Sequence, residues 1–124
     1  MIAADTSSLI AYFAGAMGQD VKAIDAAMAD GTLKLPPVVI TELLSGVKSR
    51  ATVEAGLIEA PMLDILPGYW QRAGVTRALL LEKGIKAKIP DALIAQSCID
   101  HDAALITRDT DFRHFAKHCG LRLA

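Results

Sequence analysis

The sequence has few of the residues that bind zinc or cross-link small folds. Its two cysteines, Cys98 and Cys119, form neither a CxxC pair nor a zinc-site spacing, and we expect both to pack as small apolar residues. All three histidines lie late in the chain. His114 and His118 share one helix face, which leaves a metal-binding pair open, although surface histidines near a helix end are more common.

Long apolar runs and aromatic residues are also scarce. The longest apolar run, at residues 9–17, is far shorter than the roughly 20 residues that a membrane-spanning helix needs. The N-terminus has no basic segment and carries Asp5 where a secretory signal has Lys or Arg, which predicts a cytoplasmic protein. Aromatic residues make up 5% of the chain, so no platform for stacking nucleic-acid bases is evident.

The composition that remains is that of a globular protein. Hydrophobic residues make up 52% and charged residues 22% of 124 residues, which predicts one folded domain over residues 1–124. Short apolar segments alternate with helical patterns, and this order predicts an α/β fold, a three-layer α/β/α sandwich with a central parallel sheet of four to five strands. The expected strands are residues 1–4, 33–40, 62–66, 103–107 and 121–123.

Acidic residues recur where these elements meet. An acidic residue follows the first expected strand, and an acidic residue lies near the start of two later helices. The stretch "ALITRDTDF" places two acidic residues after another expected strand. Right-handed crossovers bring the carboxyl ends of parallel strands to one edge of the sheet, so we expect these acids to converge there. Helix capping explains any one of them alone, but it does not require a common space. The acids are Asp5, Glu42, Asp91, Asp109 and Asp111.

Carboxylates that converge repel one another unless a cation lies between them. Hard oxygen ligands select Mg²⁺ or Mn²⁺, and the absence of a thiolate or imidazole cluster argues against zinc. Five of the 14 acids belong to the expected site, and the other nine are outnumbered by 13 Lys and Arg. A negative pocket in a mildly basic surface suits a polyanion held through metal ions.

Four segments, "MIAADTSSLI", "VVITELLSG", "IPDALIAQS" and "LITRDTDF", carry a resemblance over nearly the whole chain. On them the sequence resembles the PIN-domain ribonucleases, and within that family the VapC-like toxins of toxin–antitoxin pairs. The resemblance implies a PIN-like fold in which the catalytic metal is held by carboxylates, with Asp111 as a second-tier ligand or a helix cap. Thr6 and Thr107 resemble the supporting residues that orient those carboxylates. The implied metal-binding and catalytic residues are Asp5, Glu42, Asp91 and Asp109.

The implied activity is endoribonuclease hydrolysis of RNA phosphodiester bonds with Mg²⁺ or Mn²⁺ as cofactor. Asp5 and Asp91 are the first choices as direct ligands, and Glu42 and Asp109 as ligands through water or as residues that orient the attacking water. Four basic residues flank the site and either track the RNA backbone or are solvated surface charges. They are Arg108, Arg113, Lys86 and Lys88.

The resemblance also implies partners: a homodimer, and a cognate antitoxin that wraps a hydrophobic groove. Tyr12, Phe13, Leu44, Val47 and Trp70 are candidates for this groove, or are core residues at helical spacing.

Two other functions stay open, a non-toxin metal-dependent nuclease acting on RNA or DNA, and a catalytically silent PIN-like binding module. A haloacid-dehalogenase-like phosphatase is disfavoured, because it needs a DxD motif at the first strand and position 7 is Ser7.

Overall fold

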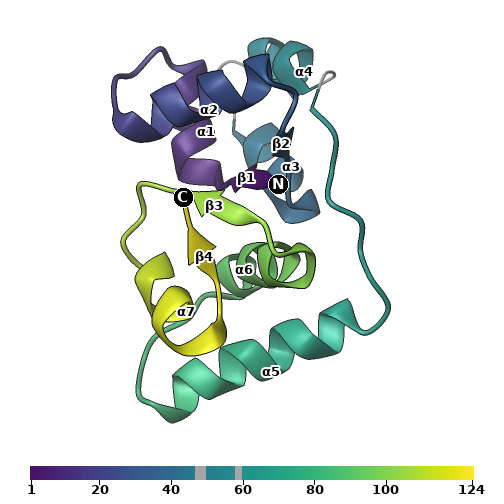
Figure 1. The fold of residues 1–124 in the computed structure, drawn as a ribbon, viewed down its shortest axis with the longest axis vertical. Coiled ribbons are helices and arrows are strands. Elements are labelled where there is room, and N and C mark those ends of the chain that lie inside the picture. The colour runs from purple at the N-terminus through teal and green to yellow at the C-terminus, as the bar shows by residue number, and fades with distance from the viewer. Residues whose placement is uncertain (47–49, 58–59) are drawn as a thin grey trace.

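A parallel β-sheet lies at the centre of the fold (Figure 1). The computed structural model describes residues 1–46, 50–57 and 60–124. The sheet has the order β2-β1-β3-β4, and all pairs are parallel. The α/β class and the central parallel sheet expected from the sequence are confirmed. The strands are β1 (Ile2–Ala4), β2 (Leu33–Lys34), β3 (Ala104–Ile106) and β4 (Arg122–Leu123).

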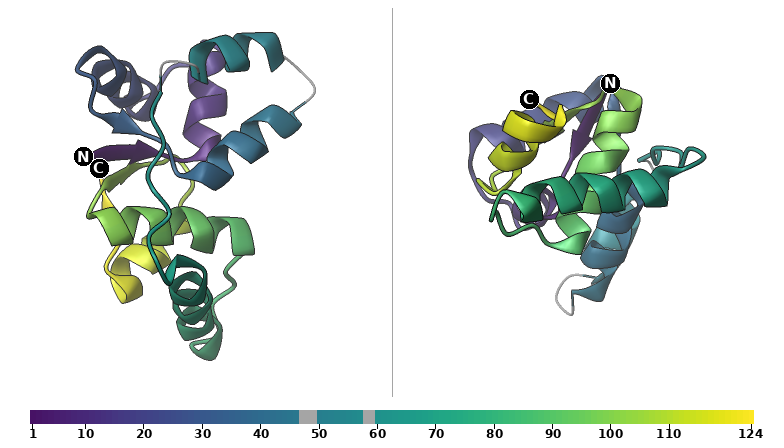
Figure 2. Two further views of the ribbon diagram at one scale, coloured as in Figure 1. Left: turned by 90° about the vertical axis from the view of Figure 1, so that its right-hand side faces the viewer. Right: turned by 90° about the horizontal axis from the view of Figure 1, so that it is seen from below.

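Two groups of helices pack around the sheet. Helices α1 and α2 contact each other, and α2 contacts β2 and β3; the second group is α5, α6 and α7, of which α6 contacts β3 and α7 contacts β4. The chain moves from β1 to β2 in one direction across the sheet, and from β2 to β3 and on to β4 in the other. Right-handed crossovers therefore place the two groups on opposite faces. Figure 2 shows α5 on the outside of α6. The helices are α1 (Thr6–Phe13), α2 (Gln19–Ala29), α3 (Pro37–Ser45), α4 (Arg50–Leu57), α5 (Tyr69–Glu82), α6 (Ile89–His101) and α7 (Phe112–Cys119).

The core is built from side chains of the strands and of the helix faces that cover them. Leu9 of α1, Ile24 of α2, Leu105 of β3 and Phe112 and Phe115 of α7 are all almost fully buried. Large apolar side chains on both helix groups therefore anchor the sheet from either side. Among the described residues, no helix combines the length and the apolar character that crossing a membrane requires.

The expected strand at residues 33–40 is right only at its start, where β2 covers Leu33–Lys34, and the expected strand at residues 62–66 is wrong. Residues 38–40 belong to α3, because the Pro36-Pro37 pair starts a helix there and proline suits the first helical turn despite the β-branched run that follows. Glu42 consequently lies within α3 and not at its first turn. Residues 62–66 form no strand, and their pairing with the sheet is reduced to one isolated parallel bridge between Leu35 and Met62.

The two central strands leave the sheet side by side and in the same direction. Ala4 pairs with Ile106, and the backbone N–H of Asp5 donates to the Ile106 carbonyl at 3.1 Å. The segments that follow β1 and β3 therefore start from neighbouring points on one edge of the sheet, although about a hundred residues separate them in the chain.

Candidate metal centre

The four principal acids predicted from the sequence line one cleft. The cleft has a volume of about 260 Å³ and lies at the edge where β1 and β3 end. Asp5 follows β1, Glu42 comes from α3, Asp91 from the first turn of α6, and Asp109 from the segment after β3. Four separate parts of the chain thus deliver carboxylates to one space. The complete lining is Asp5, Thr6, Ser7, Ile10, Glu42, Lys88, Pro90, Asp91, Ile94 and Asp109.

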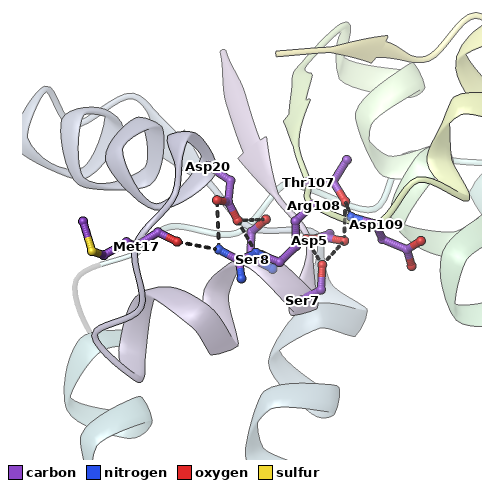
Figure 3. A network of polar contacts seen from close by, with 8 residues as sticks. All are labelled: Asp5, Ser7, Ser8, Met17, Asp20, Thr107, Arg108 and Asp109. Atoms are coloured by element: carbon purple, nitrogen blue, oxygen red, sulfur yellow. Dashed lines mark hydrogen bonds and ion pairs between the residues drawn. The ribbon is translucent and has the colours of Figure 1, made fainter.

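Asp5 is the most buried of these acids and is held by several donors (Figure 3). The residue is 2% exposed, and its carboxylate caps α1 by accepting the backbone N–H of Ser8 at 3.0 Å. The Ser7 hydroxyl lies 3.0 and 2.9 Å from its two oxygens, and the Thr107 hydroxyl donates to Oδ2 at 2.6 Å. The one Ser7 hydroxyl hydrogen is shared between the two oxygens, so the carboxylate accepts three donors in all and keeps an acceptor position for a further ligand.

The two threonines expected to orient carboxylates contact them in the structure. Thr6 donates to Glu42 Oε1 at 2.7 Å, which links the start of α1 to α3. Thr107 donates to Asp5 and accepts the backbone N–H of Asp109 at 3.0 Å. One hydroxyl thus fixes the spacing between Asp5 and the segment that carries Asp109, while the catalytic and metal-binding roles of these acids stay predictions.

The closest group of carboxylates is Asp91, Asp109 and Asp111. One oxygen from each lies within 4.8 Å of the others, a separation at which one cation can contact all three. Asp111 stands at the N-cap position of α7, but its side chain accepts no capping hydrogen bond. Its backbone N–H instead donates to Asp109 Oδ1 at 2.9 Å. The Asp111 carboxylate is exposed. Of the two roles expected for Asp111, second-tier ligand and helix cap, the structure does not support the helix cap, because the capping hydrogen bond is missing.

The acids of the cleft perturb one another. Burial raises the pKa of Asp91 from 3.8 to about 6, and the nearby carboxylates of Asp109, Glu42 and Asp111 add to the shift against an opposing effect of Lys88. Near neutral pH, Asp91 is ionised at a cost to the folded state, and a bound cation would remove that cost.

The stability of the metal-free protein should therefore depend on pH between about 4 and 7. Because the folded-state pKa of Asp91 lies above its unfolded value, its contribution is fully present below the unfolded pKa and is lost as pH rises through about 6. We expect the free energy of unfolding, measured by urea titration in EDTA, to be smaller at about pH 7.5 than at about pH 5. Asp91→Asn should flatten this dependence; an equal slope in the variant would contradict the assignment.

The four basic residues expected near RNA differ in position. Lys88 lines the cleft, whereas Lys86 is exposed and is not part of its lining. Arg108 forms an ion pair with Asp20, and Arg113 donates to the Thr110 carbonyl at 3.0 Å. Of the four, only Lys88 borders the acids directly.

Three residues with contacts to the site were not singled out by the sequence. Ser7 and Ser8 follow Asp5 and look like ordinary residues of a helix start, which is the position in which they contact its carboxylate. Asp20 looks like an ordinary acid at the start of a helix, because its partner Arg108 lies 88 residues away in the chain. Only the folded structure brings these residues together.

Comparisons with known proteins agree with the fold. The family model of the PIN domain matches residues 2–118. The structure of VapBC2 from Rickettsia felis bound to a DNA fragment from its promoter superimposes with a TM-score of 0.80 and 20% identity, over 100% of this chain and 98% of that one. VapBC-5 from Mycobacterium tuberculosis, a member of the VapBC family of toxin–antitoxin systems, superimposes with a TM-score of 0.71 and 21% identity. The match covers 98% of this chain and 95% of that one. No curated protein sequence matches.

Proposed function

Because this chain belongs to the PIN domain family, we propose that it is a metal-dependent endoribonuclease that acts in the cytoplasm as the toxin of a toxin–antitoxin pair. The observation that carries the proposal is the cleft in which Asp5, Glu42, Asp91 and Asp109 meet. A domain that needs acids only as helix caps has no reason to aim four of them at one space, because their mutual repulsion destabilises the fold.

The donors in the cleft suit a hard divalent cation. Its lining offers carboxylate and hydroxyl oxygens and contains no imidazole or thiolate, which favours Mg²⁺ or Mn²⁺ over zinc. Asp91, Asp109 and Asp111 would hold the cation, with Asp5 and Glu42 oriented behind or beside them. When bound, such a cation activates water and offsets negative charge on a phosphodiester.

The protein's own residues prepare the site for this chemistry. Thr107 and Ser8 hold Asp5 in place, and Thr6 holds Glu42, so the carboxylates do not need to reorganise when substrate arrives. Lys88 is the cationic residue of the cleft and is placed to contact an RNA phosphate. Asp91 retains a proton more readily than an ordinary aspartate, so protons compete with the cation as pH falls below about 6.

The proposed partners are an antitoxin and a second copy of the chain. The antitoxin proposal is supported by the two similar structures, both VapBC complexes. Exposed apolar side chains on α5 and at the start of α6, namely Trp70, Val75 and Ile89, offer a surface of the kind that proteins cover. Of the five residues expected to form a groove, Tyr12, Phe13 and Leu44 are half-buried, and Val47 lies outside the described residues.

RNA cleavage in the presence and absence of metal tests the activity. The purified protein should cut single-stranded or structured RNA with Mg²⁺ or Mn²⁺ and lose at least about 100-fold in rate in EDTA, because the carboxylates alone offer no nucleophile. The Arg122→Gln variant serves as a control, because it removes only an exposed ion pair with Asp102 and should cleave RNA at the wild-type rate.

Cleavage that persists in EDTA would refute the metal-dependent mechanism. Preference for DNA in the parallel assay would replace the proposal with a DNA nuclease, and binding of RNA without cleavage would favour a silent binding module.

A further inference from the structure

We propose that Asp20 is a positioning residue of the metal centre, which acts through Ser8 and Arg108 on the two segments that hold Asp5. This inference rests on the proposed function for its consequence in catalysis, but the arrangement itself is a property of the metal-free protein. Asp20 does not line the cleft, and it belongs to α2, which supplies none of the site's acids.

The first connection runs through α1. The Ser8 hydroxyl donates to Asp20 Oδ2 at 2.8 Å, and the backbone N–H of the same residue donates to Asp5 Oδ1 at 3.0 Å. Ser8 is fully buried, so its hydroxyl has no water to replace Asp20 as a partner. Ser8 is therefore held by Asp20 through its side chain and by Asp5 through its backbone, and this fixes the first turn of α1 relative to the Asp5 carboxylate.

The second connection runs through the segment after β3. Arg108 donates from Nε to Asp20 Oδ2 at 2.7 Å and from Nη2 to Oδ1 at 3.0 Å, a two-bond pairing that fixes orientation as well as distance. On either side of Arg108 in the chain are Thr107, which donates to Asp5 Oδ2, and Asp109, whose N–H donates to Thr107. Figure 3 shows Arg108 between Asp20 and this pair.

The surroundings of Asp20 favour a fixed charged pair. Its side chain is only 11% exposed, and the hydrogen bonds from Arg108 and Ser8 lower the pKa of Asp20 to about 2, so that it stays ionised wherever the protein is folded and active. Gly18 has a φ of +150° and leaves the pair room: a Cβ there would lie 2.5 Å from Asp20 Oδ1 and 3.0 Å from Arg108 Nη2. Gly18→Ala therefore disturbs the pair without changing either partner, although it also strains the backbone at the start of α2.

This arrangement gives Arg108 a different role from the RNA contact expected from the sequence. A guanidinium that tracks a phosphate backbone must be free to turn toward it, whereas two donors of Arg108 are already engaged by Asp20 and Nη2 also reaches the Met17 carbonyl at 3.3 Å. The pair instead ties α2 to the segment that carries Asp109. The two roles predict different results when either partner is replaced.

Amide hydrogen exchange in the metal-free protein tests the positioning directly. We expect Asp20→Asn, Arg108→Gln and Gly18→Ala each to speed exchange of the Ser8 or Asp109 amide by about 10-fold or more, because the hydrogen bonds of these amides lose their support. Arg72→Gln is the control. The Arg72–Asp100 pair is also two-bonded and has similar exposure, but it joins α5 to α6. Arg72→Gln thus removes a comparable ion pair elsewhere in the fold, and it should leave the exchange rates of the Ser8 and Asp109 amides unchanged.

Binding of Mn²⁺, followed by electron paramagnetic resonance, tests the consequence. Groups that orient metal ligands typically contribute 10–100-fold to metal affinity, and we expect a loss of about 10-fold in Asp20→Asn and in Arg108→Gln, but none in Arg72→Gln. The double variant should be no worse than the stronger single variant, since both changes break one pair. The Michaelis constant for RNA should change less than kcat in each.

Unchanged Ser8 and Asp109 exchange in Asp20→Asn would overturn the inference whatever the activity. A second result would also overturn it: Arg108→Gln raises the Michaelis constant and weakens the salt dependence of RNA binding, while Asp20→Asn has no effect. That result would identify Arg108 as an RNA contact. Failure of the wild-type protein to bind Mn²⁺ or to cut RNA counts against the proposed function alone, since the exchange measurement is made without either ligand.

Discussion

Asp91→Asn is expected to abolish metal-dependent RNA cleavage and, at the same time, to make the metal-free protein more stable. Asp91 is half-buried among the carboxylates of Asp109, Glu42 and Asp111, and its raised pKa of about 6 measures how unfavourable its charge is there. Asparagine has nearly the same shape without the charge, so it relieves the repulsion. A pKa difference of this size corresponds to about 3 kcal/mol, and solvent screening of this partly exposed side chain leaves an expected gain on the order of 2 kcal/mol near neutral pH.

The same neutral side chain is a much poorer ligand for a divalent cation. Loss of a group that merely supports a ligand costs about 10–100-fold, so loss of a ligand should reduce cleavage by more than about 100-fold. Urea unfolding in EDTA and an RNA cleavage assay with Mg²⁺ measure the two effects. Asp102→Asn makes the same change at the other end of α6, where the side chain is exposed, and should change neither quantity much. An active Asp91→Asn variant would rule out the proposed site.

Asp5→Asn is expected to abolish cleavage as well, but with the opposite effect on stability. Asp5 is 2% exposed, and its oxygens accept hydrogen bonds from Ser7, Ser8 and Thr107. An amide offers only one oxygen, so its NH₂ group faces the Thr107 hydroxyl, whose hydrogen then loses its acceptor on Asp5. An unsatisfied buried donor costs about 1–3 kcal/mol, which should lower the free energy of unfolding by a similar amount.

Thermal and urea unfolding of Asp5→Asn at several pH values measure this loss, and the cleavage assay measures activity in parallel. Thr107→Val is a useful comparison, because it removes one of the donors to Asp5 while leaving the carboxylate in place. It should retain part of the activity, with a loss of about 10–100-fold. If Asp5→Asn were as stable as the wild-type protein, the hydrogen-bond network seen around Asp5 would not exist in solution.

The sequence was sufficient to predict the strands and acids that build the centre of the molecule. β1 and β3 each consist of a short apolar segment followed at once by polar residues, and both were predicted within one or two residues. Parallel pairing then puts Asp5 and Asp109 on one edge, because the connectivity rules act on the order of elements and need no side-chain detail. The meeting of these acids in one cleft follows from the same rule.

The sequence was misleading where local preference and the tertiary structure disagree. Residues 38–40 are β-branched and suit a strand, but the helix α3 that begins at Pro37 includes them. For the same reason Glu42 reaches the cleft from within a helix, where Thr6 fixes its side chain. The role of Asp20 was beyond sequence reasoning, because its partners Ser8 and Arg108 lie 12 and 88 residues away and each contact is ordinary by itself.

The pairing of β1 with β3 also has a consequence for synthesis of the protein on the ribosome. Asp5 directly follows the first strand, yet the strand beside it and the Thr107 hydroxyl that holds its carboxylate come 102 residues later. Chains are made from the N-terminus at about 5–20 residues per second, and contacts this distant in sequence form only after the later partner has emerged. A growing chain therefore contains Asp5 for most of its synthesis without the neighbours that complete the centre. The proposed cleavage activity is therefore expected to appear only after Thr107 and Asp109 have left the ribosome and joined Asp5.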